Sequence, residues 1–277
     1  MLKREIVRHE LAVRVVTVQE KYFRTESMLA VRVAGAALHD FISTGPGDHM
    51  KVFFPDPASG VLTPPYRTED GSIQRPDNAV SINRDYTPLR FQSGDADTPP
   101  SLEIEFLIHD NPGPATTWAI DAKSGDELAL VGPRGSKMVP QDVDRVLLIG
   151  DETTLPSISR WIALLPAEVK ISALVQAENE TIDDYFSAEE RSRTSLEWLY
   201  REDGPGQLIE AVRSARELIS DRTYVWAGGE AGELIAVRRF LKYELALNPE
   251  NFHVEGYWRQ GVTNHDHHSP LDQSDPD

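Results

Sequence analysis

The sequence predicts an antiparallel β-barrel or sandwich followed by an α/β domain with a mostly parallel sheet. Over the first half, short apolar and alternating runs are separated by Gly- and Pro-rich turns, which is typical of antiparallel β structure. From about residue 140, apolar strands alternate with helical patterns, which indicates βαβ units. The length of 277 residues allows two such domains, each with a core of its own.

The strands expected in the first half combine apolar runs, alternation and β-branched residues. They are "LAVRVVTVQE" (11–20), "MLAVRVAG" (28–35), "MKVFF" (50–54), "LEIEFLIH" (102–109) and "ELALVG" (127–132). The stretch "RDYTPLRF" (84–91) is expected to add one more strand. The segments "STGPGDH", "PDPASG" and "TPPYRTEDGS" have the composition of turns.

The second half alternates expected strands with expected helices. The strands are "VDRVLLIG" (143–150), "VKISALVQA" (169–177), "TSLEWLY" (194–200), "TYVWAGGE" (223–230) and "NFHVEGYWRQG" (251–261). The helices cover "LPSISRWIALL" (155–165), "GQLIEAVRSAREL" (206–218) and "ELIAVRRFLKYELAL" (233–247). We therefore predict a barrel domain at residues 1–140 and an α/β domain at 141–262. The Asp-rich, apolar-poor segment 263–277 is expected to be disordered.

Composition narrows the class of protein. The net charge of −17 argues against nucleic acid or an anionic membrane as partner, although a locally basic site is compatible with it. No apolar run is long enough for a transmembrane helix, and the charged N-terminus is unlike a secretory signal. Without cysteine, thiolate metal sites are excluded, and a cytoplasmic location is expected. The tail residues His265, His267 and His268 favour a flexible segment over a metal site, so no protein metal site is predicted.

Two strand–helix junctions of the second half have the form of ligand sites. In "LIGDETTLPSISRWI", a buried strand ends at Gly150, and Thr153 or Thr154 can cap the helix that follows. In "VWAGGEAGELIAVRRFL", a strand runs into Gly228 and Gly229 before a helix. Ligands of α/β sheets bind at such strand ends, so the two junctions together could form a dinucleotide crevice. The alternative is a pair of well-capped, tight turns, and the sequence lacks GxGxxG.

Three further segments could carry a ligand. In "HDNPGPATTWA" (109–119), a small-residue loop could cradle a pyrophosphate, although most Gly-Pro turns are only turns. In "RDYTPLRF", Arg84 could pair with phosphate, Tyr86 could pack on a ring and Thr87 could bond a ring heteroatom. In "GYWRQG" (256–261), Trp258 could cover an aromatic cofactor or pack into the core. By itself, the octet "RDYTPLRF" (84–91) favours an exposed strand with solvated arginines.

Taken in order, these five motifs resemble the siderophore-interacting proteins, which are FAD-dependent ferric-siderophore reductases of the ferredoxin–NADP reductase superfamily. The resemblance runs from about residue 5 to residue 261. It implies an FAD-binding barrel followed by a pyridine-nucleotide-binding α/β domain, with NADPH or NADH as reductant. It also implies a ferric siderophore as substrate, and it leaves the flavin to carry the chemistry, so no catalytic side chain is expected.

The resemblance assigns roles to individual positions. The expected contacts of the flavin and its phosphates are Arg84, Tyr86 and Thr87, and those of the pyrophosphate and adenosine side are His109, Gly113, Ala115, Thr116 and Thr117. The expected lining of the nicotinamide-dinucleotide side is Asp151, Glu152, Thr153, Thr154, Ala227, Gly228 and Glu230, with Trp258 near the flavin. The expected siderophore-binding cations are Lys51, Arg134 and Arg259.

The sequence departs from the family pattern R-x-Y-T-x-R, because Leu89 occupies the last position and Arg90 follows it. Neighbouring strand residues face opposite sides, so one flavin or phosphate contact is absent or has moved to Arg90. Gly229 stands where alanine is more usual, which we expect to be a mild change, and Gln260 replaces a residue that is often basic.

Three other functions stay open at this point. One is a reductase of the same kind that receives electrons from ferredoxin instead of a nicotinamide. Another is a ferric-siderophore binding protein without turnover. The third is a general flavin oxidoreductase that acts on quinones or free ferric chelates. The protein is expected to be a monomer, and the sequence does not indicate which siderophore it uses.

Overall fold

The computed structural model describes residues 2–77, 80, 82–266 and 269–276. Two compact units are present: residues Ile6–Met138 form one, and Met1–Glu5 together with Val139–Asp277 form the other. His267 and His268 lie outside the described residues.

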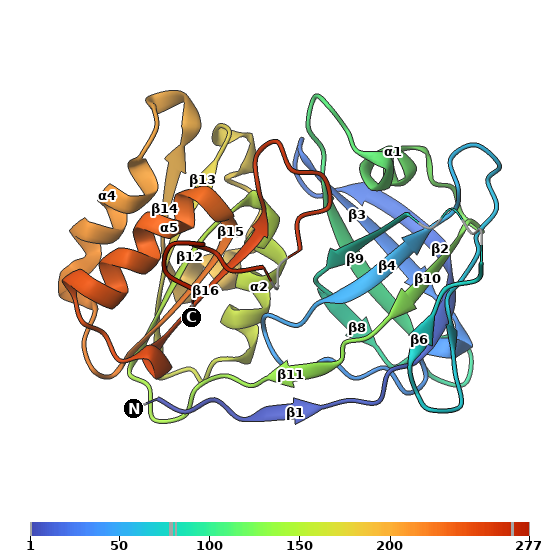
Figure 1. The fold of residues 1–277 in the computed structure, drawn as a ribbon, viewed down its shortest axis with the longest axis horizontal. Coiled ribbons are helices and arrows are strands. Elements are labelled where there is room, and N and C mark those ends of the chain that lie inside the picture. The colour runs from blue at the N-terminus through green and yellow to red at the C-terminus, as the bar shows by residue number, and fades with distance from the viewer. Residues whose placement is uncertain (1, 78–79, 81, 267–268, 277) are drawn as a thin grey trace. The chain divides into compact units, whose positions relative to one another are not determined.

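The unit Ile6–Met138 is built on a seven-stranded antiparallel sheet in the order β7-β4-β10-β2-β3-β9-β8 (Figure 1). Its strands are β2 (Val13–Phe23), β3 (Met28–Ala34), β4 (Met50–Phe54), β7 (Ile82–Tyr86), β8 (Arg90–Gln92), β9 (Ser101–Leu107) and β10 (Glu127–Val131). Two small two-stranded sheets accompany it, namely β1 (Ile6–Arg8) with β11 (Gly135–Lys137) and β5 (Tyr66–Arg67) with β6 (Ile73–Gln74). This confirms the antiparallel fold class.

A large apolar cluster lies in this first unit. Val31, Val33, Leu102, Ile104 and Leu128 are all fully buried in it, and they come from three strands of the large sheet. The helix α1 (Pro114–Asp121) packs its Ala115 and Ala119 against the same cluster. The core therefore fixes the strands that carry the octet and the helix that follows β9. The unit also contains a short 3-10 turn, η1 (Ala36–Leu38).

The other unit contains a parallel five-stranded sheet in the order β14-β13-β12-β15-β16. Its strands are β12 (Arg145–Asp151), β13 (Lys170–Ala177), β14 (Thr194–Tyr200), β15 (Thr223–Glu230) and β16 (Phe252–Trp258). The helices are α2 (Leu155–Leu164), α3 (Ala188–Arg193), α4 (Gln207–Ser214) and α5 (Ala231–Arg239) (Figure 1). Short turns of helix are η2 (Glu152–Thr154), η3 (Glu180–Ile182), η4 (Arg201–Asp203), η5 (Ala215–Leu218), η6 (Phe240–Glu244) and η7 (Pro249–Asn251).

Helices cover both faces of this parallel sheet. Leu147 and Ile149 of β12 belong to a core shared with α4 and α5. On the other face, Trp161 of α2 contacts Trp226 of β15, with ring centroids 6.2 Å apart. The first strand, β12, is central, and the chain leaves it toward β13 and later returns to β15 on its other side. The carboxyl ends of β12 and β15 thus form a topological switch point, where α/β sheets bind ligands.

The N-terminal five residues belong to the α/β unit because Arg4 is anchored there. Its guanidinium lies 4.9 Å from the ring centroid of Trp161 and donates a 3.1 Å hydrogen bond to the Tyr224 hydroxyl. No helix in the described part of the chain is both long and apolar enough to cross a membrane.

Candidate functional site

The octet 84–91 is not one strand, as expected from the sequence, but two. Strand β7 ends at Tyr86 and β8 begins at Arg90. The former pairs with β4 and the latter with β9, which places the two strands at opposite edges of the seven-stranded sheet. Pro88 explains the break, because proline cannot continue a ladder. The octet therefore links the two edges of the sheet.

Arg84 and Tyr86 lie on β7, and Thr87 follows directly. Tyr86 packs on the apolar core, with its ring centroid 4.6 Å from that of Phe106. Burial raises the pKa of the Tyr86 phenol, so this ring stays neutral. Arg84 is partly exposed and donates a 2.7 Å hydrogen bond to the Asn83 carbonyl. These three positions present a cation, a ring and a hydroxyl from one strand end, and they fit an anionic aromatic group.

The departure from the family pattern at Leu89 has a structural counterpart. The Leu89 side chain is only 5% exposed, whereas Arg90 is exposed. The Arg90 guanidinium lies 3.9 Å from a carboxylate oxygen of the buried Glu103. The two side chains thus differ in environment as the strand alternation predicts.

The segment after β9 was expected to be a loop, but a helix starts within it. Helix α1 begins at Pro114, because proline suits the first helical position, and Gly113 is its N-cap. No side chain caps this end, and a Cβ added at Gly113 would meet nothing within 4 Å. Open space beside uncapped amides fits a phosphate oxygen. The residues of this end therefore fit the pyrophosphate of a dinucleotide.

The other positions of this segment differ in exposure. Ala115 and Thr116 are buried in the first turn of α1, Thr117 is exposed, and His109 is exposed beyond the end of β9. Only the exposed side chains among them could reach a ligand directly, so Ala115 and Thr116 would act through their backbone amides.

The three cations expected to bind substrate have different local partners. Lys51 on β4 forms an ion pair with Asp85, with a nitrogen–oxygen distance of 2.8 Å. Arg134 is exposed and, within the described residues, has no ion pair. Arg259 belongs to the α/β unit, where its Nη2 donates a 3.0 Å hydrogen bond to the Leu271 carbonyl. Lys51 and Arg134 share the first unit, and Arg259 does not.

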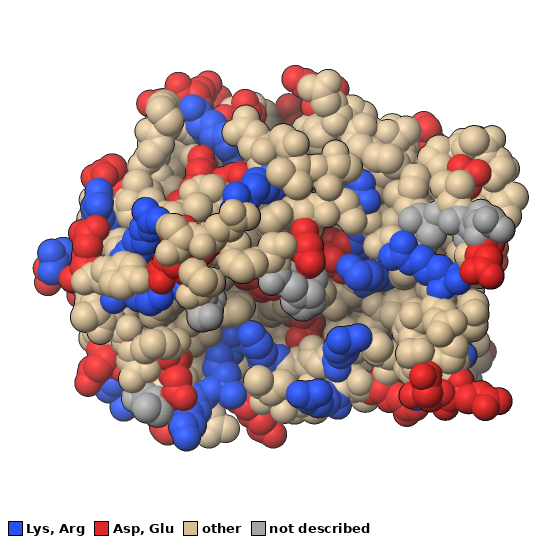
Figure 2. Space-filling model, viewed as in Figure 1, with Lys and Arg blue, Asp and Glu red and all other residues tan. Residues whose placement is uncertain are grey.

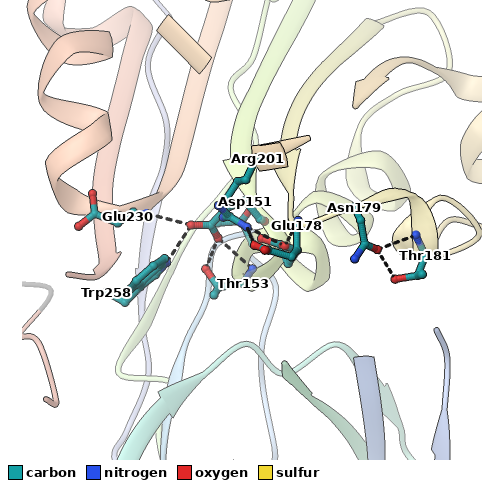
Figure 3. Close-up of polar contacts among 10 residues, drawn as sticks. Asp151, Thr153, Glu178, Asn179, Thr181, Arg201, Glu230 and Trp258 are labelled. Atoms are coloured by element: carbon teal, nitrogen blue, oxygen red, sulfur yellow. Dashed lines mark hydrogen bonds and ion pairs between the residues drawn. The ribbon is translucent and has the colours of Figure 1, made fainter. Parts of the chain in front are cut away.

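In the α/β unit, the carboxyl end of β12 carries a buried aspartate. The Asp151 side chain accepts hydrogen bonds from the Thr153 amide, the Glu230 amide and the Trp258 indole, at 2.9, 2.9 and 2.8 Å (Figure 3). Burial raises the pKa of Asp151, while the hydrogen bonds from Thr153 and Trp258 act in the opposite direction. The aspartate thus connects β12 with β15 and β16.

Glu152, the next residue, connects β12 with the other two strands. It is 4% exposed, and its Oε1 accepts from the Glu178 amide after β13 and from Arg201 after β14, at 2.6 and 2.8 Å. Thr154 is fully buried and donates to the Asp151 carbonyl at 2.6 Å. Together, the adjacent carboxylates contact the ends of all five strands.

The β15–α5 junction packs closely against β12. Ala227 is fully buried, and a Cβ added at Gly228 would lie 3.0 Å from a Thr154 methyl group. Gly229 has a φ of +133°, and a Cβ there would lie 2.6 Å from a carboxylate oxygen of Asp151. The sequence comparison suggested that glycine in place of alanine is a mild change here, but this geometry requires glycine. Glu230 caps α5 by accepting the Glu233 amide at 2.7 Å.

Arg201 and Glu233 were missed by the sequence reasoning. Arg201 directly follows β14 in "LYRED", so its position at a strand end was the available signal. Glu233 lies in the first turn of α5, and burial raises its pKa. Within the described residues, no group of three or more His, Asp or Glu side chains could hold a metal ion.

Comparison with known proteins covers both units. Residues 17–137 match the family described as siderophore-interacting FAD-binding domain, and residues 143–261 match the family described as siderophore-interacting protein. An NADPH-dependent ferric-chelate reductase of Escherichia coli is 31% identical over 255 residues, which cover 91% of this chain and 95% of the relative. The ferric vibriobactin reductase of Vibrio cholerae is 27% identical, with 91% and 90% covered.

Solved structures agree with these matches. A siderophore utilization protein from T. fusca has a TM-score of 0.83 and 33% identity, and the alignment covers 96% of this chain and 100% of that protein. The cytochrome b5 reductase domain of Ulva prolifera nitrate reductase has a TM-score of 0.62 at 14% identity and shows the fold alone. Both units, in this order and over nearly the whole length, place the chain in one family: it belongs to the siderophore-interacting proteins.

Proposed function

We propose that the protein is an FAD-dependent ferric-siderophore reductase that uses NAD(P)H and releases Fe(II). One observation carries this proposal: a single chain combines an antiparallel unit that fits a flavin dinucleotide with a parallel sheet that has a dinucleotide-type switch point. The ferric-chelate reductase of E. coli matches over both units. Bound FAD would supply the coupling between a two-electron nicotinamide donor and one-electron reduction of Fe(III).

The residues of this chain would bind and orient the reactants. Arg84 offers positive charge to the FAD phosphates, Tyr86 offers a ring supported by Phe106, and Thr87 offers a hydroxyl. The uncapped amides at the start of α1 would hold the pyrophosphate. The carboxyl ends of β12 and β15 would receive the nicotinamide dinucleotide.

The substrate would be an anionic ferric chelate, attracted by Lys51, Arg134 and Arg259. Acidic and basic side chains both occur across the face seen in Figure 2, so local potential need not follow the net charge of −17. Iron arrives with the substrate, and reduction releases it from the siderophore because ferrous iron binds hard oxygen donors more weakly than ferric iron. A cytoplasmic location and a monomeric state stay predictions from the sequence.

The test begins with the visible spectrum of the purified protein. We expect flavin absorbance, bleaching by NADH or NADPH under anaerobic conditions, and Fe(II) captured by a ferrous trap when a ferric siderophore is added. Protein that neither carries nor takes up FAD would contradict the proposal and leave the siderophore-binding alternative. If only reduced ferredoxin bleaches the flavin, the electron donor is ferredoxin and not NAD(P)H.

The flavin seat is tested by Arg84→Ala. We expect this variant to lose most bound FAD, because a charge-assisted bond to phosphate is removed. Arg67→Ala is the matched control, since Arg67 is a half-exposed arginine of the same unit that pairs with Glu10. Full FAD occupancy in Arg84→Ala, measured by absorbance ratio, would contradict the assignment of this strand.

A further inference from the structure

The Asp151 carboxylate at the end of β12 is saturated by groups of its own chain. Its Oδ1 accepts from the Thr153 amide at 2.9 Å and the Thr153 hydroxyl at 2.5 Å. Its Oδ2 accepts from the Glu230 amide at 2.9 Å and the Trp258 indole at 2.8 Å (Figure 3). A carboxylate offers about four acceptor positions, so these donors occupy all of them. With 3% of its surface exposed, Asp151 has no oxygen left for a ligand.

The bond to Trp258 fixes the direction of a ring that is itself partly exposed. The indole has one donor and no acceptor, so its only strong hydrogen bond determines where the ring edge points. Trp258 is also the last residue of β16.

The backbone around this bond is shaped to allow it. The pairing of β15 with β16 shifts register between Gly229 and Glu230, and this shift brings Trp258 opposite Glu230. Gly229 lacks a Cβ that would lie 2.6 Å from Oδ2 of Asp151. The Gln260 amide donates to Oε1 of Glu230 at 3.0 Å, which holds the chain just beyond the tryptophan. Three separate features therefore converge on one indole orientation.

We propose that Asp151 is a positioning residue that orients Trp258 for the nicotinamide-dependent step, and that it is not a contact of the nicotinamide dinucleotide. This inference rests on the proposed reductase function. The sheet end that carries Trp258 is the end at which the dinucleotide would bind, so a tilted indole would misplace the reacting ring. Misplacement by about 1 Å can cost up to roughly a hundredfold in rate.

The experiment compares Asp151→Asn, Trp258→Phe and the double variant. An asparagine replaces one oxygen by an NH₂ donor, so it cannot serve all of the surrounding donors. Phenylalanine keeps an aromatic ring and removes the N–H. We expect each single variant to slow anaerobic flavin reduction by NADH or NADPH about tenfold. The nicotinamide concentration that gives half of the maximal rate should change little. The double variant should be no slower than the slower single variant, because both remove the same bond.

A second readout needs no bound cofactor. The chain has five tryptophans, so protein labelled with 5-fluorotryptophan gives up to five ¹⁹F signals. The signal that disappears in Trp258→Phe belongs to Trp258, and we expect it to shift in Asp151→Asn. Trp198→Phe is the matched control, because Trp198 is a partly exposed tryptophan of β14 at the other edge of the same sheet. It should leave the reduction rate unchanged.

Three results would overturn the inference. The first is an unshifted Trp258 signal in Asp151→Asn. The second is a double variant whose loss in reduction rate is the product of the two single losses, and the third is a raised half-saturating nicotinamide concentration in Asp151→Asn alone. Should Asp151→Asn not fold, Trp258→Phe decides, since an unchanged reduction rate in that variant is also contrary to the proposal. If neither nicotinamide reduces the flavin of the wild type, the proposed function fails, whereas the ¹⁹F shift still reports whether Asp151 orients Trp258.

Discussion

Gly229 is a residue at which both the backbone and a neighbouring side chain restrict substitution. Its φ of +133° is unfavourable for any other residue, and an added Cβ would lie 2.6 Å from Asp151. We expect Gly229→Ala to lower the free energy of unfolding by about 2 to 3 kcal/mol. Urea unfolding of the wild type and the variant measures the difference.

Gly204→Ala is a control that separates the cost of the backbone conformation at Gly229 from the cost of the contact with Asp151. Gly204 has a φ of +115°, but nothing lies within 4 Å of its added Cβ. We expect this control to cost about 1 kcal/mol, through backbone conformation alone. Equal losses in the two variants would show that the Asp151 contact contributes nothing.

Leu89 raises the question of whether the arginine of the family pattern could be restored. The Leu89 side chain is 5% exposed, so Leu89→Arg would place a charge where leucine is buried. We expect the free energy of unfolding to fall by roughly 2 to 4 kcal/mol. Thermal unfolding with and without added FAD provides the measurement, and an unchanged or higher Tm with FAD would instead indicate a restored phosphate contact.

At the scale of elements, Glu152 joins the ends of three strands. Its Oε1 accepts from the Glu178 amide and from Arg201. Glu152→Ala leaves a partly buried N–H and a partly buried guanidinium without this acceptor, so we expect a loss of about 3 kcal/mol in the free energy of unfolding. Glu152→Gln keeps an oxygen and removes the charge, so it should fall between the wild type and Glu152→Ala.

Glu178→Gln is the control for this carboxylate. The Glu178 side chain is 77% exposed and lies 3.7 Å from Arg201, so its ion pair is a surface pair. We expect a change within about 0.5 kcal/mol in urea unfolding. A loss as large as that of Glu152→Ala would show that Arg201 depends on both carboxylates equally.

At the scale of the whole molecule, the acidic C-terminal segment contacts α5 and the turn that follows it. Asp275 pairs with Arg238 and Lys242, and Asp272 pairs with Arg239. Hydrogen bonds from Lys242 to Asp275, and from Ser274 to Asp272, hold the pKa values of these carboxyls below the usual range. The stabilisation is therefore present above the unfolded pKa of about 3.9 and is lost as pH falls through the folded values.

Hydrogen exchange of the tail amides, corrected for its intrinsic pH dependence, tests this docking. We expect protection at neutral pH that declines under acid, and a similar decline at neutral pH in a variant carrying Asp272→Asn and Asp275→Asn. An unprotected tail at every pH would agree instead with the disorder expected from its composition.

The net charge of −17 makes the salt dependence of turnover informative. If the whole-molecule charge governed encounter with an anionic ferric chelate, screening would raise kcat/KM. Because we propose that local cations attract the chelate, we expect kcat/KM to fall with ionic strength. Arg134→Ala should flatten the dependence, since Arg134 is exposed and, within the described residues, has no ion pair. A rise with salt in the wild type would contradict attraction of the chelate by local cations.

The sequence by itself determined the two-part architecture, because the period of its apolar pattern changes from strand-like to alternating strand and helix near residue 140. Strands such as β4, β14 and β15 coincide with the predicted segments, since each is bounded by a clear change in composition. Five short motifs in order were also enough to indicate the family, because they depend on local residue types and spacing.

Only the tertiary structure decided which partners those residues have. Local pattern could not show that the octet splits between two sheet edges. It also could not show that the Asp151 carboxylate accepts hydrogen bonds from Thr153, Glu230 and Trp258. Nor could it find Arg201, which pairs with Glu152 although β13 separates the strands that the two residues follow. The contacts of Glu152 with Arg201, and of Asp151 with Glu230 and Trp258, join residues 49 to 107 positions apart, and no periodicity along the chain encodes which distant groups the sheet brings together.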